Sequence, residues 1–385
     1  MSAPFATLML ASCQYPPDLL REIPAYRSLS RMRARLRRLA LEQPAASRVL
    51  WMAGDTIYVD PTAGLFDPEQ PEDRFEAPYW FLKGRIWQRL TEQLDDTFCL
   101  ADDHEYEENW EPSARARINT GLQRSLFFGK RAHLRHMRGM HDIGDQQVLS
   151  TRLWGEREPI GGRLPCFVLD LRSERERRDA SNIATAGMCS AEQMHAFKTW
   201  LQHLAALERA DPDRPPTPKL VLSASTLLPR RLQVAEDPSV AAALNSDACD
   251  GYPAFLAQVF GSIVEHGVRG LLFLSGDEHL SFVTRAELGA PGYAPVVIHS
   301  VHASPLYGPY PFANGQSESF AEIDHFKTLG ADGLPAVRVC ASTRFVETGN
   351  GFCELSFESA GNPGAVDLRF SGETGTVRVG IQLDR

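Results

Sequence analysis

The chain has 385 residues, of which 43% are hydrophobic and 23% are charged, a composition that is typical of globular proteins. These proportions exclude a disordered, collagen-like or coiled-coil protein. The formal net charge is −9, from 49 acidic and 40 basic residues, which disfavours nucleic-acid binding over the whole surface but leaves local clusters of either sign open. The seven cysteines are scattered and none forms a Cys-x-x-Cys pair, so the sequence predicts neither a zinc ribbon nor a dithiol redox centre.

Short apolar runs alternate with longer helical patterns through the first two thirds of the chain. Continuous apolar strands that alternate with helices predict a sheet that is buried on both faces. Ser190, followed by Glu192 and Gln193, predicts the start of the fourth helix. The expected strands are 7–12, 49–53, 97–100, 166–171, 220–224, 270–274 and 296–300, and the expected helices are 17–41, 75–95, 112–137, 190–208 and 250–266.

The carboxyl-terminal part has a different pattern. Four strands are expected, at 337–346, 352–357, 366–371 and 376–382. Gly-Asn-Gly, Gly-Asn-Pro-Gly and Gly-Glu-Thr-Gly sequences separate them, which predicts tight turns and antiparallel pairing. No linker precedes this part, so we predict one domain over residues 1–385, with 337–385 as its β-rich portion.

Targeting signals are weak. No stretch approaches the ~20 apolar residues of a membrane-spanning helix, so we expect no membrane association. Residues 10–13, Leu-Ala-Ser-Cys, resemble a lipoprotein cleavage box, but no Lys or Arg precedes them and the apolar run before them is short. We therefore expect a cytoplasmic protein that keeps Cys13 inside its fold.

Four expected strands end in polar residues that can bind metal ions. Ligands collect at the carboxyl ends of strands in a sheet of this kind, so these side chains are expected to meet. Thiolate, carboxylate, phenolate and imidazole ligands suit a mixed hard and borderline site, and two adjacent cations would neutralise a concentrated acidic excess. The segments are 11–14 (Ala-Ser-Cys-Gln), 54–60 (Gly-Asp-Thr-Ile-Tyr-Val-Asp), 102–105 (Asp-Asp-His-Glu) and 275–279 (Ser-Gly-Asp-Glu-His).

In this order, the segments resemble the PhoD-like alkaline phosphatase and phosphodiesterase family of the calcineurin-like metallophosphoesterase superfamily. Residues 169–173 (Leu-Asp-Leu-Arg-Ser) and 246–253 also match, although the family commonly has Trp at the position of Cys249. The similarity runs from about residue 7 to the end. It implies an α/β fold, a four-layer α/β/β/α sandwich with an antiparallel C-terminal strand region. It also implies hydrolysis of phosphoesters, as a phosphodiesterase, an alkaline phosphomonoesterase or both.

The resemblance further implies a two-metal centre, with Fe³⁺ beside Ca²⁺ and with Zn²⁺, Mn²⁺ or Mg²⁺ as alternatives. Asp55 would bridge the two metals, and Asp102 and Asp103 would serve the second, harder cation. His104 matches a histidine that lies behind the metals in the superfamily, which makes it the candidate to stabilise or protonate the leaving oxygen. The implied ligands on the iron side are Cys13, Asp55, Tyr58, Asp277 and His279.

The expected reaction follows from the two metals. They would clamp the anionic phosphoryl oxygens and generate a bridging hydroxide that attacks phosphorus in line. The leaving alkoxide then takes a proton from His104 or from water. Arg230 and Arg231 follow the expected strand 220–224, and one of them could hold a phosphate oxygen bidentately, with a solvent-facing pair as the alternative. A nucleotide or a lipid-type diester are both candidate substrates.

An arginine-rich stretch leaves a second function open. Arginines at 27, 31, 33, 35, 37 and 38 predict a solvated helix face or a patch that recruits a polyanion. The alternative function is therefore a catalytically weak metallophosphoesterase-fold protein that binds a polyanionic partner through Arg27–Arg38. The intact set of ligand residues argues against this alternative, and nucleic acid is not the favoured partner.

Overall fold

The computed structural model describes residues 4–16, 22–60, 70, 72–111, 120–211, 213, 215–236, 239–303, 305–309, 316–331, 333–358 and 364–383. Its strands are β1 (Pro4–Ala11), β2 (Ser47–Met52), β3 (Asp96–Cys99), β4 (Gly155–Ile160), β5 (Leu164–Val168), β6 (Lys219–Leu222), β7 (Leu271–Ser275), β8 (Ser281–Gly289), β9 (Val296–Ala303), β10 (Ile323–Lys327), β11 (Arg338–Val346), β12 (Phe352–Glu358), β13 (Ala365–Ser371) and β14 (Thr376–Gln382). Its α-helices are α1 (Glu22–Ala25), α2 (Arg27–Glu42), α3 (Asp73–Leu82), α4 (Arg85–Thr91), α5 (Thr120–Met137), α6 (Asp145–Ser150), α7 (Ala191–Ala210), α8 (Leu232–Glu236), α9 (Val240–Leu244) and α10 (Pro253–His266).

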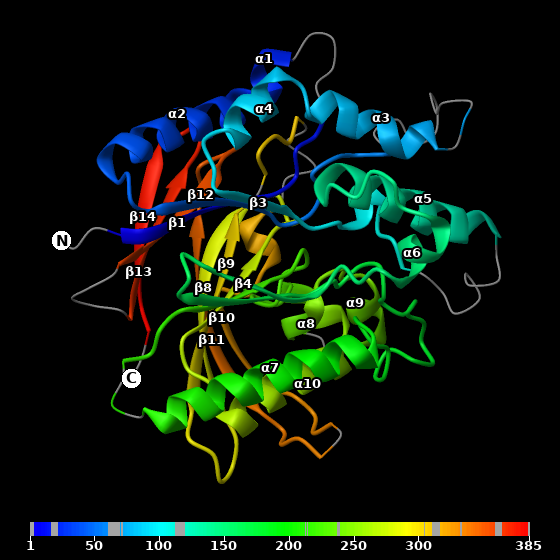
Figure 1. The fold of residues 1–385 in the computed structure, drawn as a ribbon. Coiled ribbons are helices and arrows are strands. Elements are labelled where there is room, and N and C mark those ends of the chain that lie inside the picture. The colour runs from blue at the N-terminus through cyan, green and yellow to red at the C-terminus, as the bar shows by residue number, and fades with distance from the viewer. Residues whose placement is uncertain are drawn as a thin grey trace.

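Two mixed sheets face each other in the middle of the molecule (Figure 1). One has the order β14-β13-β12-β1-β2-β3, and the other has the order β10-β11-β8-β9-β7-β6-β5-β4. β1, β2 and β3 are parallel, whereas β12 is antiparallel to β1 and pairs Leu355 with Leu8. The carboxyl-terminal strands β12, β13 and β14 are antiparallel, as predicted, and they extend the sheet that β1 begins.

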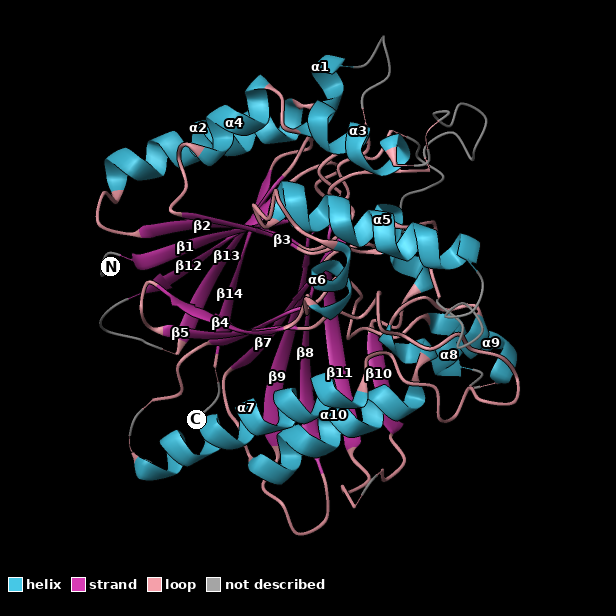
Figure 2. Cartoon of the chain, turned by 45° about the vertical axis from the view of Figure 1, so that its right-hand side comes forward, coloured by secondary structure: helices cyan, strands magenta, loops and turns pink. Residues whose placement is uncertain are grey.

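Helices cover both outer faces, which gives four layers (Figure 2). Leu8 and Leu10 of β1 lie in the core between the sheets, and Met9, between them in sequence, packs with the helices on the other face. The same alternation occurs in β7, where Leu272 lies between the sheets and Phe273 packs with α7 and α10. Successive side chains of a strand point to opposite faces, so both sheets are buried on two sides at these strands, whereas β13 and β14 have exposed residues. The predicted four-layer α/β/β/α sandwich is confirmed.

Most strands lie where the sequence predicts them, but the two edges of the eight-stranded sheet do not. β4 and β10 were not predicted, and they are the two edges of the eight-stranded sheet, where strands carry charged residues. β8 was missed because its first half is buried but contains Ser281 and Thr284, which interrupt the apolar pattern.

The helix predictions differ from the structure mainly where one expected helix is divided into two. The expected helix 75–95 is two helices, α3 and α4, which are separated at Lys83 and Gly84. Of the expected helix 112–137, residues 112–119 lie outside the described part, as do residues 17–21 of the expected helix 17–41. The predicted start at Ser190 is confirmed, because its Oγ accepts the N–H of Gln193 at 3.2 Å. Within the part of the chain that the structure describes, no helix is long and apolar enough to cross a bilayer.

Candidate metal centre

The loops after β1, β2, β3 and β7 meet at the carboxyl ends of these strands. Backbone hydrogen bonds join the first two loops, from Cys13 N–H to the Gly54 carbonyl and from Gln14 N–H to the Asp55 carbonyl at 2.9 Å. Ligand atoms of Asp55, Asp102, Asp103 and Asp277 lie within 4.8 Å of one another, although they come from three different loops. All seven predicted metal ligands are therefore brought together in the structure: Cys13, Asp55, Tyr58, Asp102, Asp103, Asp277 and His279.

Three possible metal ligands gather on one side of Asp55, and we call Cys13, Tyr58 and His279 the mixed-donor side. The Cys13 Sγ and the Tyr58 hydroxyl lie 3.4 and 3.5 Å from Asp55 Oδ2, and the same hydroxyl lies 3.4 Å from His279 Nε2. Atoms of a thiol, a phenol, a carboxylate and an imidazole at this spacing converge on one point. Such a donor set suits a transition-metal ion.

Asp55 also belongs to a second group of neighbouring carboxylates, which we call the aspartate side and which includes Asp102 and Asp103. Asp55 Oδ1, Asp102 Oδ2 and Asp103 Oδ1 are all buried and have no hydrogen-bond partner in the structure. Buried carboxylate oxygens without partners are strongly unfavourable unless a cation or water satisfies them. These oxygens fit a hard cation, and Asp55 is a member of both ligand groups, with Oδ2 near Cys13 and Tyr58 and Oδ1 without a partner.

The charges of the site also fit bound cations. Burial raises the pKa of Asp55 and of Tyr58 well above their ordinary values, and the nearby Cys13 sulfur raises both further. Burial likewise raises the pKa of Asp277, with an added contribution from Asp102. Acidic groups that repel one another inside a protein become stable in their ionised form when metal ions offset their charge.

Backbone strain is concentrated here. Five non-glycine residues among the described ranges have a positive φ, and they are Cys13 (54°), Asp55 (50°), Asn109 (54°), Asp277 (87°) and His279 (48°). Four are predicted ligands, and the backbone N–H of Asn109 donates to Asp103 Oδ2 at 2.7 Å. Each such conformation costs about 1–3 kcal/mol and persists only where the surroundings hold it, which is typical of functional sites.

Two glycines allow the loops to approach each other. A Cβ on Gly54, whose φ is +90°, would lie 2.6 Å from the Asp102 Cβ. A Cβ on Gly276 would lie 2.3 Å from the Ser12 Cβ. The glycines of the two Gly-Asp sequences are therefore required by close packing between loops.

His104 lies between the two sides. Its Nδ1 is 2.8 Å from Asp60 Oδ1, and its ring packs on Tyr58 with 4.1 Å between centroids. Burial lowers the pKa of His104, but the charges of Asp103, Asp55 and Asp60 outweigh burial and raise it to about 11. These carboxylates therefore favour the protonated form of the imidazole.

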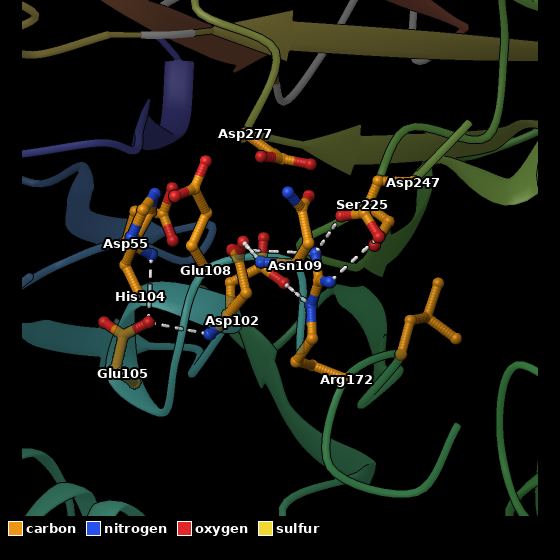
Figure 3. A network of polar contacts seen from close by, with 12 residues as sticks. Asp55, Asp102, His104, Glu105, Glu108, Asn109, Arg172, Ser225, Asp247 and Asp277 are labelled. Carbon is orange, nitrogen blue, oxygen red and sulfur yellow. Dashed lines mark hydrogen bonds and ion pairs between the residues drawn. The ribbon is translucent and has the colours of Figure 1, made fainter. Parts of the chain in front are cut away.

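Arg172 and Asp247 were not assigned roles from the sequence, and the structure places them at the aspartate side (Figure 3). Arg172 is fully buried, and its Nε donates to Asp102 Oδ1 at 2.5 Å. Its other nitrogens donate to both carboxylate oxygens of Asp247, at 3.1 and 2.6 Å. Burial opposes ionisation of Asp103, but the charge of Arg172 outweighs it and lowers the pKa of Asp103. The only sequence signal was that Arg172 lies within the matching segment 169–173.

The two candidate arginines have different surroundings. Arg230 makes two 2.7 Å bonds to Asp324, and its guanidinium lies 3.8 Å from the Phe326 ring centroid, so its described contacts are structural. The Nη2 of Arg231 donates to Glu278 Oε2 at 2.5 Å, and its side chain is 32% exposed. Glu278 separates two of the predicted ligands in sequence, so only Arg231 of this pair is linked to the centre.

The arginine-rich stretch forms α2, and several of its arginines bind other residues of the chain. Arg31 donates to the Asn350 carbonyl at 2.6 Å, and Arg35 makes two bonds, of 2.6 and 2.7 Å, to Glu354 of β12. Arg38 pairs with Glu42 on the surface. These contacts attach α2 to the sheet, and Arg27 and Arg37 remain exposed.

Two comparisons with known proteins found a similar family or structure. A family profile described as PhoD-like phosphatase matches residues 83–328. A solved structure described as "Structure of PhoD" has a TM-score of 0.59 and 14% sequence identity, over 99% of this chain and 69% of that chain. At that identity the likeness shows the fold alone. No match was found among curated proteins.

Proposed function

Because the chain belongs to the PhoD-like phosphatase family, we propose that it is a metal-dependent phosphoester hydrolase with a two-cation centre. The observation that carries the proposal is the division of Asp55 between two donor groups. Its Oδ2 faces a thiol and a phenol at 3.4 and 3.5 Å, while its buried Oδ1 has no partner. A carboxylate in this arrangement is suited to bridge two cations.

The donor types support Fe³⁺ on the mixed-donor side and Ca²⁺ on the aspartate side, with Zn²⁺, Mn²⁺ or Mg²⁺ as alternatives. Phenolate and thiolate are strong donors to a transition metal, whereas a site made only of carboxylate oxygens suits a hard cation. When bound, the cations would supply the attacking hydroxide near neutral pH and offset the charge of the phosphoryl oxygens.

The chain's own residues perform the proton transfer and hold the substrate. His104, protonated at its raised pKa of about 11, donates a proton to the leaving alkoxide. Asp60 accepts from His104 Nδ1 at 2.8 Å and thereby leaves Nε2 as the proton donor. Arg231, which is partly exposed and next to the centre, contacts a phosphoryl oxygen of the substrate.

The substrate of this proposal is a phosphoester, either a diester of nucleotide or lipid type or a monoester. We place residues 1–385 in one domain, which is supported by the pairing of β12 with β1. A cytoplasmic location remains a prediction from the sequence.

Hydrolysis assays with Asp55→Asn test the proposal. The metal-loaded protein should cleave a chromogenic bis-phosphodiester, a monoester or both, and the variant should lose at least about 10³-fold in kcat, because one bridging charge disappears from the centre. Asp95→Asn is the matched control, since Asp95 Oδ2 binds the Arg48 N–H at the opposite end of β3. Full activity in the Asp55 variant would refute the two-cation mechanism.

A further inference from the structure

Glu105 lies two residues after Asp103 in sequence, and its carboxylate accepts hydrogen bonds from four backbone amides. Glu105 is 1% exposed. Its Oε1 accepts the N–H groups of Thr56 and Ile57 at 2.7 and 3.3 Å. Its Oε2 accepts the N–H groups of Asp55 and Asp102 at 3.1 and 2.7 Å (Figure 3). A carboxylate offers about four lone-pair positions, so these bonds use its full acceptor capacity. Glu105 is therefore not available as a metal ligand.

The four amides belong to two separate loops. Asp55, Thr56 and Ile57 follow β2, and Asp102 follows β3. One oxygen atom, Oε2, binds an amide from each loop, and those two amides are the amides of Asp55 and Asp102, each of which carries a buried carboxylate oxygen without a partner. The Oε2 atom of Glu105 therefore connects the backbone of Asp55 to the backbone of Asp102, and it sets the spacing between the two loops.

The four hydrogen bonds that Glu105 accepts, which we call the Glu105 clamp, also counteract local backbone strain. Asp55 has a φ of 50°, and the Cβ that Gly54 lacks would lie 2.6 Å from the Asp102 Cβ. A left-handed aspartate next to a close contact between loops is unfavourable on its own. Hydrogen bonds from backbone amides to a carboxylate are charge-assisted and about twice as strong as neutral ones, so Glu105 can hold this arrangement.

We propose that Glu105 is a positioning residue that fixes the spacing between the two cation sites by binding the backbone amides of Asp55 and Asp102. The proposal rests on the proposed two-cation function. Glu105→Gln keeps the size of the side chain but replaces one acceptor oxygen with an NH₂ group. That group faces backbone N–H donors, so at least two of the four bonds are lost.

Cation binding to the metal-free protein tests the proposal. Calorimetric titration with Ca²⁺ should give an affinity about 10–100-fold weaker for Glu105→Gln than for the unchanged protein, the range found when residues that support metal ligands are altered. Iron content should change less, because Cys13 and His279 are not held by Glu105. Glu354→Gln is the matched control, a buried glutamate of β12 that binds Arg35 of α2 instead of a backbone amide of the candidate centre. Equal Ca²⁺ affinity in the Glu105 and Glu354 variants would overturn the proposal.

A second measurement needs no variant. In hydrogen exchange of the unchanged metal-free protein, peptides covering 54–58 and 101–106 should exchange slowly compared with the exposed turn at 290–294. Fast exchange of both segments would overturn the Glu105 clamp even if Glu105→Gln failed to fold. Failure of the proposed function gives a different result, namely an unchanged protein that binds no pair of cations and hydrolyses no phosphoester.

Discussion

The two sides of the candidate centre share Asp55 but differ in how the protein treats their charge. On the mixed-donor side, Cys13, Tyr58 and His279 lie around one carboxylate oxygen. On the aspartate side, the guanidinium of Arg172 is already bound to the carboxylates at distances down to 2.5 Å. One side therefore offers soft and borderline donors, and the other offers carboxylates whose charge is partly offset.

This difference predicts unequal cation binding. Arginine stays protonated, so Arg172 permanently removes part of the negative charge that would attract a hard cation. The affinity of a carboxylate site depends on its ligand charge, whereas thiolate and phenolate bind a ferric ion tightly. We expect the cation on the aspartate side to exchange readily while the ion on the mixed-donor side remains bound.

After the loss expected for Asp55→Asn, the next largest effect is expected from His104, which lies near both sides. His104→Gln should lower kcat by about 10²–10⁴-fold for a diester with an alkyl leaving group, which needs a proton to depart. For a nitrophenyl ester the loss should be much smaller, because nitrophenolate leaves without a proton. Steady-state kinetics on both esters measures the ratio. Equal losses on the two substrates would contradict the role of His104 as the proton donor.

Removing Arg172 tests the difference in charge between the two sides. Arg172→Met should cost about 3–5 kcal/mol in the unfolding free energy of the metal-free protein, because it leaves buried carboxylates without their counter-ion. Added Ca²⁺ should restore more stability to this variant than to the unchanged protein. Arg38→Met, which breaks an exposed pair with Glu42, is the control and should change the unfolding free energy little, because solvent and salt screen an exposed pair. Similar costs for the two variants, measured by denaturant unfolding, would show that Arg172 does not balance the site.

The sequence predicted the fold well where strands are buried on both faces. The apolar runs of β1, β2 and β7 were found because their residues contact a core on each side. β4 and β10 were missed because edge strands carry charged residues, and the break at Gly84 was missed because the hydrophobic period continues across it.

The site was predicted as a set of residues but not as a geometry. Motif order identified Asp55 and His279, yet their left-handed backbones cannot be read from residue types. Glu105 lay inside a quoted segment, but its four bonds are to backbone amides, which carry no sequence signal. Arg230 and Arg231 are neighbours and look equivalent in the sequence. Only their tertiary contacts distinguish them, because Arg230 pairs with Asp324 and Arg231 pairs with Glu278.

A smaller effect, the dependence of folding stability on pH, is expected from a histidine beside the mixed-donor side. His302 is buried behind the loop of Asp277 and His279, with its Nε2 accepting the Glu278 N–H at 3.3 Å. Burial lowers the pKa of His302 to about 3. The unfolded chain binds a proton near pH 6.5 that the folded protein does not, so stability is lost as pH falls below that value, by up to about 1.4 kcal/mol per pH unit.

Denaturant unfolding of the metal-free protein at pH 7 and pH 5 isolates this contribution. The unchanged protein should lose about 2 kcal/mol more than His302→Asn over that interval, because the variant has no imidazole to protonate. An identical pH dependence in both proteins would mean that His302 is not held neutral in the fold.

The most direct test of unequal cation binding at the two sides combines metal analysis with the visible spectrum. The purified protein should contain Fe³⁺ and show a phenolate charge-transfer band that is absent in Tyr58→Phe, and a mild Ca²⁺ chelator should remove the second cation without changing the band. A colourless protein fully loaded with Zn²⁺ or Mn²⁺, or simultaneous loss of both ions to the chelator, would contradict the account.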